Sequence, residues 1–118
     1  MTCLIVDDNP QMREVITVFV RNLADTIVEC NDGAEALAAY RTYRPDWVLM
    51  DIRMRTIDGI TATRQITAEF PAARVVIVTQ YDDRELRAAA WQAGACGYVL
   101  KDNLVELRRV LRGTPPLT

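Results

Sequence analysis

Short apolar runs rich in β-branched residues alternate with longer stretches of helical period along this chain, and no other feature constrains its fold as strongly. Most of these runs are apolar at every position, as strands are when both faces of a sheet are covered. The alternation predicts repeated βα units around a parallel sheet. A length of 118 residues leaves room for one such domain. The five expected strands are residues 3–6, 27–30, 47–50, 75–78 and 97–100.

The stretches between the strands carry residues that start and stop helices. Asn9 stands before a proline, a combination that opens a helix, and Asp83 caps the fourth helix. The second helix is expected to start near Asp32 and the third near Asp58. The last helix is expected over residues 103–112, where a glycine ends it. In the first helix, the side chains expected to face the sheet are Met12, Val15, Ile16, Phe19 and Leu23.

Polar side chains collect where the expected strands stop. Asp7 and Asp8 follow the first strand, Asp51 follows the third, Thr79 the fourth and Lys101 the fifth. The carboxyl ends of parallel strands lie along one edge of an open α/β sheet, and ligands bind in the crevice there. If the first strand lies beside the third, these residues share the crevice and the second strand stays outside it. We therefore expect the functional site at this edge.

The aspartates in this crevice repel one another unless something neutralises them. A proton or an arginine is one solution, and a hard divalent cation is another. A lone aspartate after a strand often only caps a helix, but Asp7 and Asp8 are adjacent and Asn9 already supplies a cap. We favour Mg²⁺ (or Mn²⁺), with Asp8 and Asp51 as direct ligands and Asp7 holding a metal-bound water, because Mg²⁺ usually keeps several waters.

A cation at this place would form part of a cradle for a phosphoryl group. The hydroxyl of Thr79 and the ammonium of Lys101 would lie opposite it, and phosphoryl oxygens need positive charge and hydrogen-bond donors. Asp51 can be the nucleophile, because carboxylates accept phosphoryl groups as acyl phosphates. Lys101 is the only lysine among fourteen basic residues, and a compact ammonium suits a phosphate. An exposed lysine at a strand end is the plainer alternative.

The composition excludes several other functions. The chain has no histidine, so it contains neither a histidine-activated nucleophile nor an imidazole zinc site. Its formal net charge of −2, without a basic block, argues against direct binding of nucleic acid. Its longest aliphatic run, residues 75–78, is far too short to span a bilayer. Cys3, Cys30 and Cys96 have no metal-binding spacing and are expected to be small buried side chains of a cytoplasmic protein.

Four motifs in order carry a resemblance to a known family. The segments LIVDDNP, LMDIRMRTIDG, VVIVTQYDD and GACGYVLKD resemble the receiver domain of two-component response regulators over about residues 2–112. The resemblance implies a flavodoxin-like (βα)5 α/β domain at residues 1–112, with sheet order 2-1-3-4-5. It leaves residues 113–118 as a linker or tail. Receivers of the LuxR-type (NarL/FixJ) subfamily often carry GYVLKD, so the resemblance favours that subfamily.

The resemblance also implies a phosphoacceptor and a metal site. Asp51 would accept the phosphoryl group, and Mg²⁺ would lie at Asp7, Asp8 and Asp51 with the backbone carbonyl of Arg53 as a further ligand. The donor would be a phosphohistidine on a sensor histidine kinase, which agrees with a chain that has no histidine of its own. The chain would not be an enzyme beyond catalysing its own aspartyl phosphorylation and dephosphorylation.

A switch is implied on the other side of the phosphoryl group. Thr79 and Lys101 would contact the phosphoryl oxygens, and Tyr98 would turn inward when Thr79 moves. The output surface would be formed by the fourth helix, the fifth strand and the fifth helix. Trp91 is either a half-buried aromatic or an interface anchor on this surface. The arginines of the last helix are either a solvated face or a contact with a partner: Arg108, Arg109 and Arg112.

Some positions depart from the usual pattern of the family. Arg55 stands where a proline is common, so the loop around it is expected to be freer. Gln80 replaces a small residue, and Arg53 and Tyr81 flank the expected path of an attacking water. We therefore predict slow self-dephosphorylation. Asp102 follows the lysine in place of a frequent proline.

Other functions stay open at the level of the residues. A small Mg²⁺-dependent phosphohydrolase or a nucleotide-binding enzyme also uses aspartates at strand ends, but the DxD spacing and glycine-rich turn that these enzymes need after the first strand are missing. A receiver that dimerises without phosphorylation is a third possibility. We favour a receiver that forms a homodimer on phosphorylation. It would control transcription through a helix-turn-helix domain absent from this chain.

Overall fold

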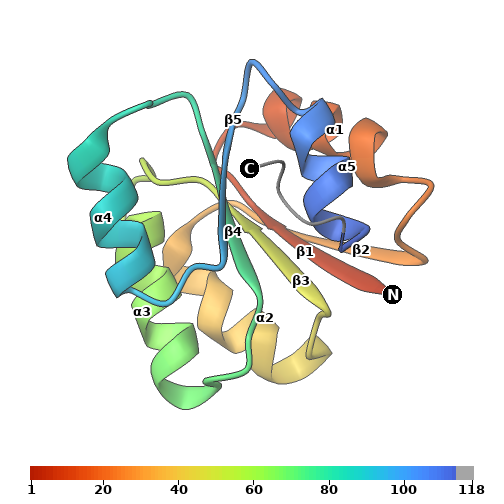
Figure 1. The fold of residues 1–118 in the computed structure, drawn as a ribbon. Coiled ribbons are helices and arrows are strands. Elements are labelled where there is room, and N and C mark those ends of the chain that lie inside the picture. Colours follow the sequence, from red (N-terminus) through yellow and green to blue (C-terminus); the bar gives the residue numbers. More distant parts are fainter. Residues whose placement is uncertain (114–118) are drawn as a thin grey trace.

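The computed structural model describes residues 1–113 and contains one five-stranded parallel sheet in the order β2-β1-β3-β4-β5 (Figure 1). The flavodoxin-like fold and the strand order 2-1-3-4-5 are therefore confirmed. The expected linker, residues 113–118, lies outside the described residues apart from Gly113. The strands are β1 (Thr2–Val6), β2 (Thr26–Cys30), β3 (Trp47–Met50), β4 (Val75–Thr79) and β5 (Gly97–Leu100).

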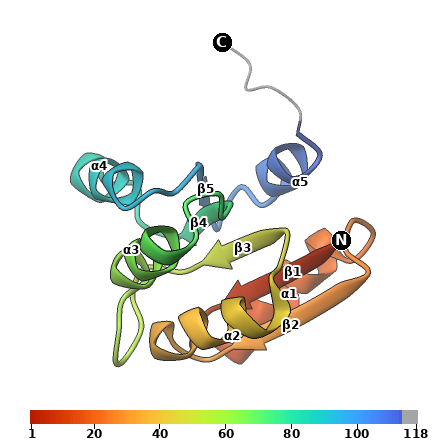
Figure 2. The same ribbon diagram turned by 90° about the horizontal axis from the view of Figure 1, so that it is seen from below.

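Helices cover both faces of the sheet. In Figure 1, α1 and α5 lie together on one side of the strands and α2, α3 and α4 lie on the other. Figure 2 shows α4 and α5 on opposite sides of β5, the edge strand. The elements are α1 (Pro10–Val20), the 3-10 turn η1 (Gly33–Glu35), α2 (Ala36–Tyr43), α3 (Gly59–Glu69), α4 (Arg84–Gln92) and α5 (Val105–Leu111).

The hydrophobic core is split in two by the sheet. Within β1, Leu4 and Val6 pack under α2 and α3, whereas Cys3 and Ile5 pack under α1 and α5. Successive strand residues point to opposite faces, so a strand covered on both sides needs an apolar residue at every position. This is why the strands were recognisable as continuous apolar runs. No described helix is long and apolar enough to cross a membrane.

The expected helix starts are mostly confirmed. The side chain of Asn9 accepts hydrogen bonds from the main-chain N–H groups of Gln11 and Met12, and Asp58 and Asp83 cap α3 and α4. Asp32 caps the 3-10 turn η1, and the α-helix begins only after that turn. The last helix begins at Val105, two residues later than expected. Its buried leucines, Leu107 and Leu111, lie within the helix as expected.

Two expectations about burial, those for Val15 and Cys96, were wrong, and one residue expected in the first helix, Leu23, lies outside it. Val15 is 44% exposed, because it is rotated by about 100° from its neighbour Ile16, which faces the sheet. Leu23 lies beyond the end of α1 at Val20, although it still packs against the core. Cys96 is exposed, because it lies in the turn between α4 and β5. The other two cysteines are buried as expected.

Candidate functional site

The carboxyl ends of four strands meet at one pocket. Asp7 and Asp8 follow β1, Asp51 follows β3, Gln80 follows β4, and Lys101 follows β5. The pocket has a volume of about 190 Å³. Its lining consists of one neighbour, Asn9, and all of the expected site residues except Thr79 and Tyr98: Asp7, Asp8, Asp51, Arg53, Gln80, Tyr81 and Lys101. The crevice predicted from the strand ends is therefore present, and below it is called the phosphoryl pocket.

The three aspartates converge in this pocket. One carboxylate oxygen from each of Asp7, Asp8 and Asp51 lies within 4.8 Å of the other two. Asp7 and Asp51 are buried, with 1% and 7% of their surfaces exposed, whereas Asp8 is exposed. Oxygen-rich sites with one open side are the kind that Mg²⁺ and Mn²⁺ occupy, since these ions retain water ligands.

Asp51 is held in place mainly through its backbone. Its N–H donates to the carbonyl oxygen of Val6 on β1 at 2.9 Å, and its own Oδ1 accepts from the N–H of Ile52 at 2.9 Å. Gly59, the first residue of α3, lies against the carbonyl of Asp51: a Cβ on Gly59 would lie only 1.7 Å from that oxygen. A glycine is therefore required for α3 to approach the end of β3 this closely.

Lys101 joins two of the aspartates. Its Nζ lies 3.0 Å from Oδ2 of Asp7 and 3.3 Å from Oδ2 of Asp51. The main-chain N–H of Lys101 donates to the carbonyl of Thr79 at 2.8 Å, and this hydrogen bond joins the end of β5 to the end of β4. Burial lowers the pKa of Lys101, but the two carboxylates outweigh this effect, so the net pKa is raised and the side chain stays an ammonium.

Asp51 carries the clearest electrostatic signature of the site. Burial, and after it the charge of Asp7, raises the pKa of Asp51 to about 6, against the opposing effect of Lys101 and the N–H of Ile52. A single ammonium therefore does not compensate for the charge of these acids. A further positive charge in the pocket would favour the ionised form of Asp51.

The donor set fits a divalent cation. Within residues 1–113, the buried Oδ2 of Asp7 contacts Lys101 as an ion pair but receives no hydrogen bond of good geometry. A buried carboxylate oxygen without a donor costs free energy unless a cation or water completes its shell. Asp7, Asp8 and Asp51 are thus suited to hold Mg²⁺, and Arg53 also lines the pocket.

The two expected switch residues both contact the main chain of one residue, Tyr81. Thr79 is fully buried, does not line the phosphoryl pocket, and accepts a hydrogen bond at Oγ1 from the N–H of Tyr81 at 3.3 Å. The hydroxyl of Tyr98 donates to the carbonyl of Tyr81 at 2.7 Å. Arg87 on α4 lies over the Tyr98 ring, with its Cζ 4.4 Å from the ring centroid.

The outer rim of the pocket is formed by the residues predicted to tune dephosphorylation. The guanidinium of Arg53 stacks on the ring of Tyr81, with Cζ 4.5 Å from the centroid. Arg53 and Gln80 are exposed, and Tyr81 is partly buried. All three line the pocket, so the structure brings them together there.

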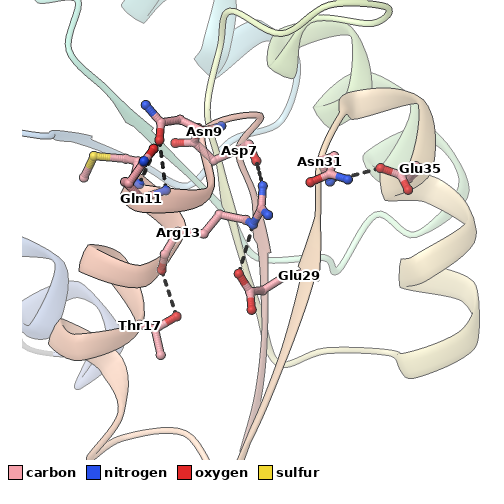
Figure 3. A network of polar contacts seen from close by, with 9 residues as sticks. Asp7, Asn9, Gln11, Arg13, Thr17, Glu29, Asn31 and Glu35 are labelled. Atoms are coloured by element: carbon pink, nitrogen blue, oxygen red, sulfur yellow. Dashed lines mark hydrogen bonds and ion pairs between the residues drawn. The ribbon is translucent and has the colours of Figure 1, made fainter.

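Sequence reasoning missed the residues that support the pocket from outside. Arg13 on α1 reaches the end of β1 and Glu29 on β2, as Figure 3 shows. Asp32 accepts from the N–H of Thr56 at 3.3 Å and so contacts the loop that follows Asp51. The one signal in the sequence is Glu29, an acid that interrupts an otherwise apolar strand.

The chain matches one known protein family over nearly all of its described residues. Residues 3–112 match the family described as "Response regulator receiver domain", which covers all of the described elements except the first residue of β1. The chain belongs to the response regulator receiver domains. The resemblance found in the four motifs is therefore confirmed, and the domain is a signalling module of two-component systems rather than a classical enzyme.

Curated relatives point to regulation of transcription and to chemotaxis. The chain is 38% identical over 101 residues to the transcriptional regulatory protein LnrK of Bacillus subtilis, covering 84% of this chain and 46% of that protein. It is 36% identical over 99 residues to the chemotaxis protein CheY of the same organism, covering 83% and 82%. The chain spans about half the length of the transcriptional regulators that head these relatives.

Solved structures agree with this assignment. A LuxR-family two-component response regulator from Aurantimonas sp. SI85-9A1 superposes with a TM-score of 0.83 at 34% identity, covering 95% of this chain and 85% of that one. The signal receiver domain described as that of NarL from Mycobacterium tuberculosis gives a TM-score of 0.82 at 28% identity, covering 95% and 96%. The chain is therefore similar to LuxR-type and NarL-type receivers, as its GYVLKD motif indicated.

Proposed function

We propose that this receiver domain accepts a phosphoryl group on Asp51 from a phosphohistidine of a sensor histidine kinase. The observation that carries the proposal is the convergence of Asp7, Asp8, Asp51 and Lys101 in one pocket at the carboxyl ends of the strands. Of the three acids, Asp51 is the one that follows β3, the central strand of the sheet. Its Oδ2 lies 3.3 Å from the Nζ of Lys101.

The proposed step is a displacement at phosphorus. A carboxylate oxygen of Asp51 attacks the phosphorus, the P–N bond to the kinase histidine breaks, and its electron pair returns to the imidazole. Lys101 lies beside Asp51 and neutralises charge on the phosphoryl oxygens. Mg²⁺, held by Asp7, Asp8, Asp51 and the carbonyl of Arg53, supplies further charge neutralisation when bound.

The readout of phosphorylation is proposed to pass through Tyr81. In the structure, Oγ1 of Thr79 accepts from the N–H of Tyr81. A phosphoryl group on Asp51 draws the hydroxyl of Thr79 away from this contact and towards itself. The carbonyl oxygen of Tyr81 accepts from the hydroxyl of Tyr98. Movement of Thr79 therefore changes the support of Tyr98 and, through it, the surface formed by α4, β5 and α5.

The lifetime of the acyl phosphate is proposed to depend on the rim of the pocket. Gln80 is exposed, and Arg53 and Tyr81 stack on each other beside it. Side chains of this size restrict the approach of water to phosphorus, so spontaneous dephosphorylation is slow. Arg55 is exposed on the same loop as Arg53, and this loop is connected to Asp32 through the N–H of Thr56.

The wider function is proposed from the relatives. Several of them are transcriptional regulators about twice the length of this chain, so we propose that a helix-turn-helix effector domain beyond the receiver binds DNA. Phosphorylation would favour a homodimer, and the domain would act in the cytoplasm without binding nucleic acid or membrane itself. Trp91 on α4 is 54% exposed and lies on the proposed output surface.

Phosphoryl incorporation tests the proposal. Wild-type protein and Asp51→Asn are incubated with acetyl phosphate and Mg²⁺, and the increase in mass is measured. The wild type is expected to gain one phosphoryl group, and Asp51→Asn none. No gain in the wild type, or an equal gain in the variant, would contradict the assignment of Asp51. Asp46→Asn serves as a control, because Asp46 is exposed at the other end of β3.

A further inference from the structure

Arg13 occupies a sheltered position between three elements. Its side chain is only 14% exposed, which is low for an arginine on an outer helix. Its Nη1 donates to the main-chain carbonyl of Asp7 at 2.7 Å, and its Nε donates to Oε1 of Glu29 at 2.9 Å. Figure 3 shows the guanidinium reaching from α1 to the end of β1 and to β2. Arg13 thus connects α1 to the main chain of Asp7, which follows β1, and to Glu29 on β2.

Arg13 contacts the main chain of Asp7 and leaves its carboxylate to other groups. Oδ1 of Asp7 accepts from the N–H of Asn9 at 2.9 Å, and Oδ2 contacts Lys101 at 3.0 Å. The guanidinium therefore fixes the peptide from which this side chain projects without occupying the oxygens that face the pocket. A planar guanidinium with several donors suits such a double contact, whereas an ammonium is a single point charge.

We propose that Arg13, braced by Glu29, is a positioning residue for the divalent cation: it holds the turn at Asp7 and Asp8 in the geometry that binds Mg²⁺. This inference rests on the proposed function, because it takes these aspartates as the cation site. The carboxylates of the three acids repel one another in the absence of a cation. A main-chain anchor beside the first of them opposes this repulsion and keeps the site assembled.

An effect of charge alone would have the opposite sign. Arg13 is a cation near a cation site, so its removal would strengthen Mg²⁺ binding if only long-range electrostatics mattered. Loss of a positioning contact weakens binding instead, typically by about tenfold for groups that orient metal ligands. The direction of the change in affinity therefore separates the two explanations.

The affinity for Mg²⁺ is measured by isothermal titration calorimetry on the full chain. Arg13→Met is expected to raise the Kd by about tenfold. Arg21→Met removes the same charge from the exposed end of α1 and is expected to bind Mg²⁺ as the wild type does. Tighter or unchanged binding in Arg13→Met would overturn the proposal. Far-UV circular dichroism checks that each variant is folded.

Two further variants keep the test decisive. Arg13→Met combined with Glu29→Met leaves the net charge unchanged and is expected to retain the weaker binding, whereas a wild-type Kd in this double variant would contradict positioning. Arg13→Lys keeps the charge but not the guanidinium and is expected to give an intermediate Kd. If Arg13→Met does not fold, a wild-type Kd in Arg13→Lys overturns the proposal.

The outcome for Arg13 is distinguishable from the outcome for the proposed function. If the wild type itself binds no Mg²⁺ and takes no phosphoryl group, the proposed function fails. If the wild type does both and the Arg13 variants match it, only the positioning role fails. At saturating Mg²⁺ the Arg13→Met variant is expected to approach the wild-type rate of phosphorylation by acetyl phosphate, because the loss lies in cation affinity.

Discussion

Two hollows on this domain differ in size and in chemistry. The phosphoryl pocket has a volume of about 190 Å³ and is lined mainly by charged and polar side chains. The larger hollow, here called the α2–α3 groove, has a volume of about 670 Å³ and is lined by residues that include Leu37, Ala38, Arg41, Gln65 and Glu69. The smaller hollow is the one with converging carboxylates, so size alone does not locate function.

The charged groups of the two hollows also differ in how they are paired. In the α2–α3 groove, Arg41 and Glu69 pair with each other on the surface, and each lowers the cost of the other's charge. In the phosphoryl pocket, three acids face one lysine, and the pKa of Asp51 is raised. A surface ion pair whose two charges cancel has no net charge to attract a ligand, whereas a buried cluster with excess negative charge favours the binding of a cation.

The largest expected effect is on stability. Gly59→Ala places a Cβ against the carbonyl of Asp51 and is expected to lower the free energy of unfolding by about 3 kcal/mol. Ala38→Ser in the α2–α3 groove, where the side chain is exposed, is expected to stay within about 0.5 kcal/mol of the wild type. Urea unfolding measures both. Equal stabilities would show that α3 can move away from β3 at little cost.

Lys101→Ala is expected to have the next largest effect. Loss of one charge-assisted contact costs about 2 kcal/mol, so the rate of phosphorylation by acetyl phosphate should fall by about thirtyfold. Mg²⁺ binding should be largely intact, and phosphorylation should no longer alter the output surface. Arg41→Ala in the groove serves as the matched loss of a cation. A similar fall in rate for both variants would indicate a general charge effect.

Asp51→Asn is expected to stabilise the metal-free protein by about 1 kcal/mol at pH 7.5, after allowance for solvent screening. The native pKa of Asp51 lies at about 6, above its ordinary value of 3.8, so ionisation above pH 6 destabilises the fold. The advantage of the variant should therefore shrink as the pH falls from 6 to 4, where the native carboxyl takes up a proton.

Thermal unfolding in the presence of a chelator checks this prediction. Saturating Mg²⁺ should reverse the order, because the wild type binds the cation more tightly than the variant. Glu69→Gln in the α2–α3 groove should change stability in the opposite direction, since the pairing with Arg41 lowers the pKa of Glu69. An Asp51→Asn variant less stable than the wild type without metal would show that the acid cluster is not strained.

The smallest expected effect concerns the rim of the pocket. Gln80→Ala is expected to speed the loss of the phosphoryl group by about threefold, which corresponds to roughly 0.7 kcal/mol, because water reaches the acyl phosphate more easily. Gln65→Ala in the α2–α3 groove removes the same side chain elsewhere and should leave the decay unchanged. Decay is followed by mass spectrometry after the phosphodonor is removed. An unchanged decay in Gln80→Ala would contradict the prediction of slow dephosphorylation by obstruction.

The fold and the members of the phosphoryl pocket were predictable because both depend on local pattern and topology. A parallel sheet with the first strand beside the third brings the residues after Val6, Met50 and Leu100 to one place, whatever the details of packing. The burial of Thr79 was not predictable: the residue is the last of a strand, and only the packing around it shows that it is fully buried and does not line the pocket.

The support of the pocket was beyond the reach of the sequence for the same reason. Arg13 and Glu29 are sixteen positions apart and meet only because α1 packs across β1 and beside β2. The link from Tyr98 to Tyr81 likewise depends on the distance between β5 and the loop after β4. The exposure of Val15 and Cys96 depends on how a helix is rotated and where a turn lies, which periodicity defines only to within a residue or two.

The sequence by itself determined that this chain forms five βα units and that its acids and its single lysine share one edge of the sheet. These conclusions follow from period, capping and strand ends, which act over a few residues. The tertiary structure decided which oxygen Lys101 contacts, how far the pKa of Asp51 rises, and that Arg13 anchors the first aspartate. Those properties depend on distances between elements far apart in the chain, and such distances exist only once the core is packed.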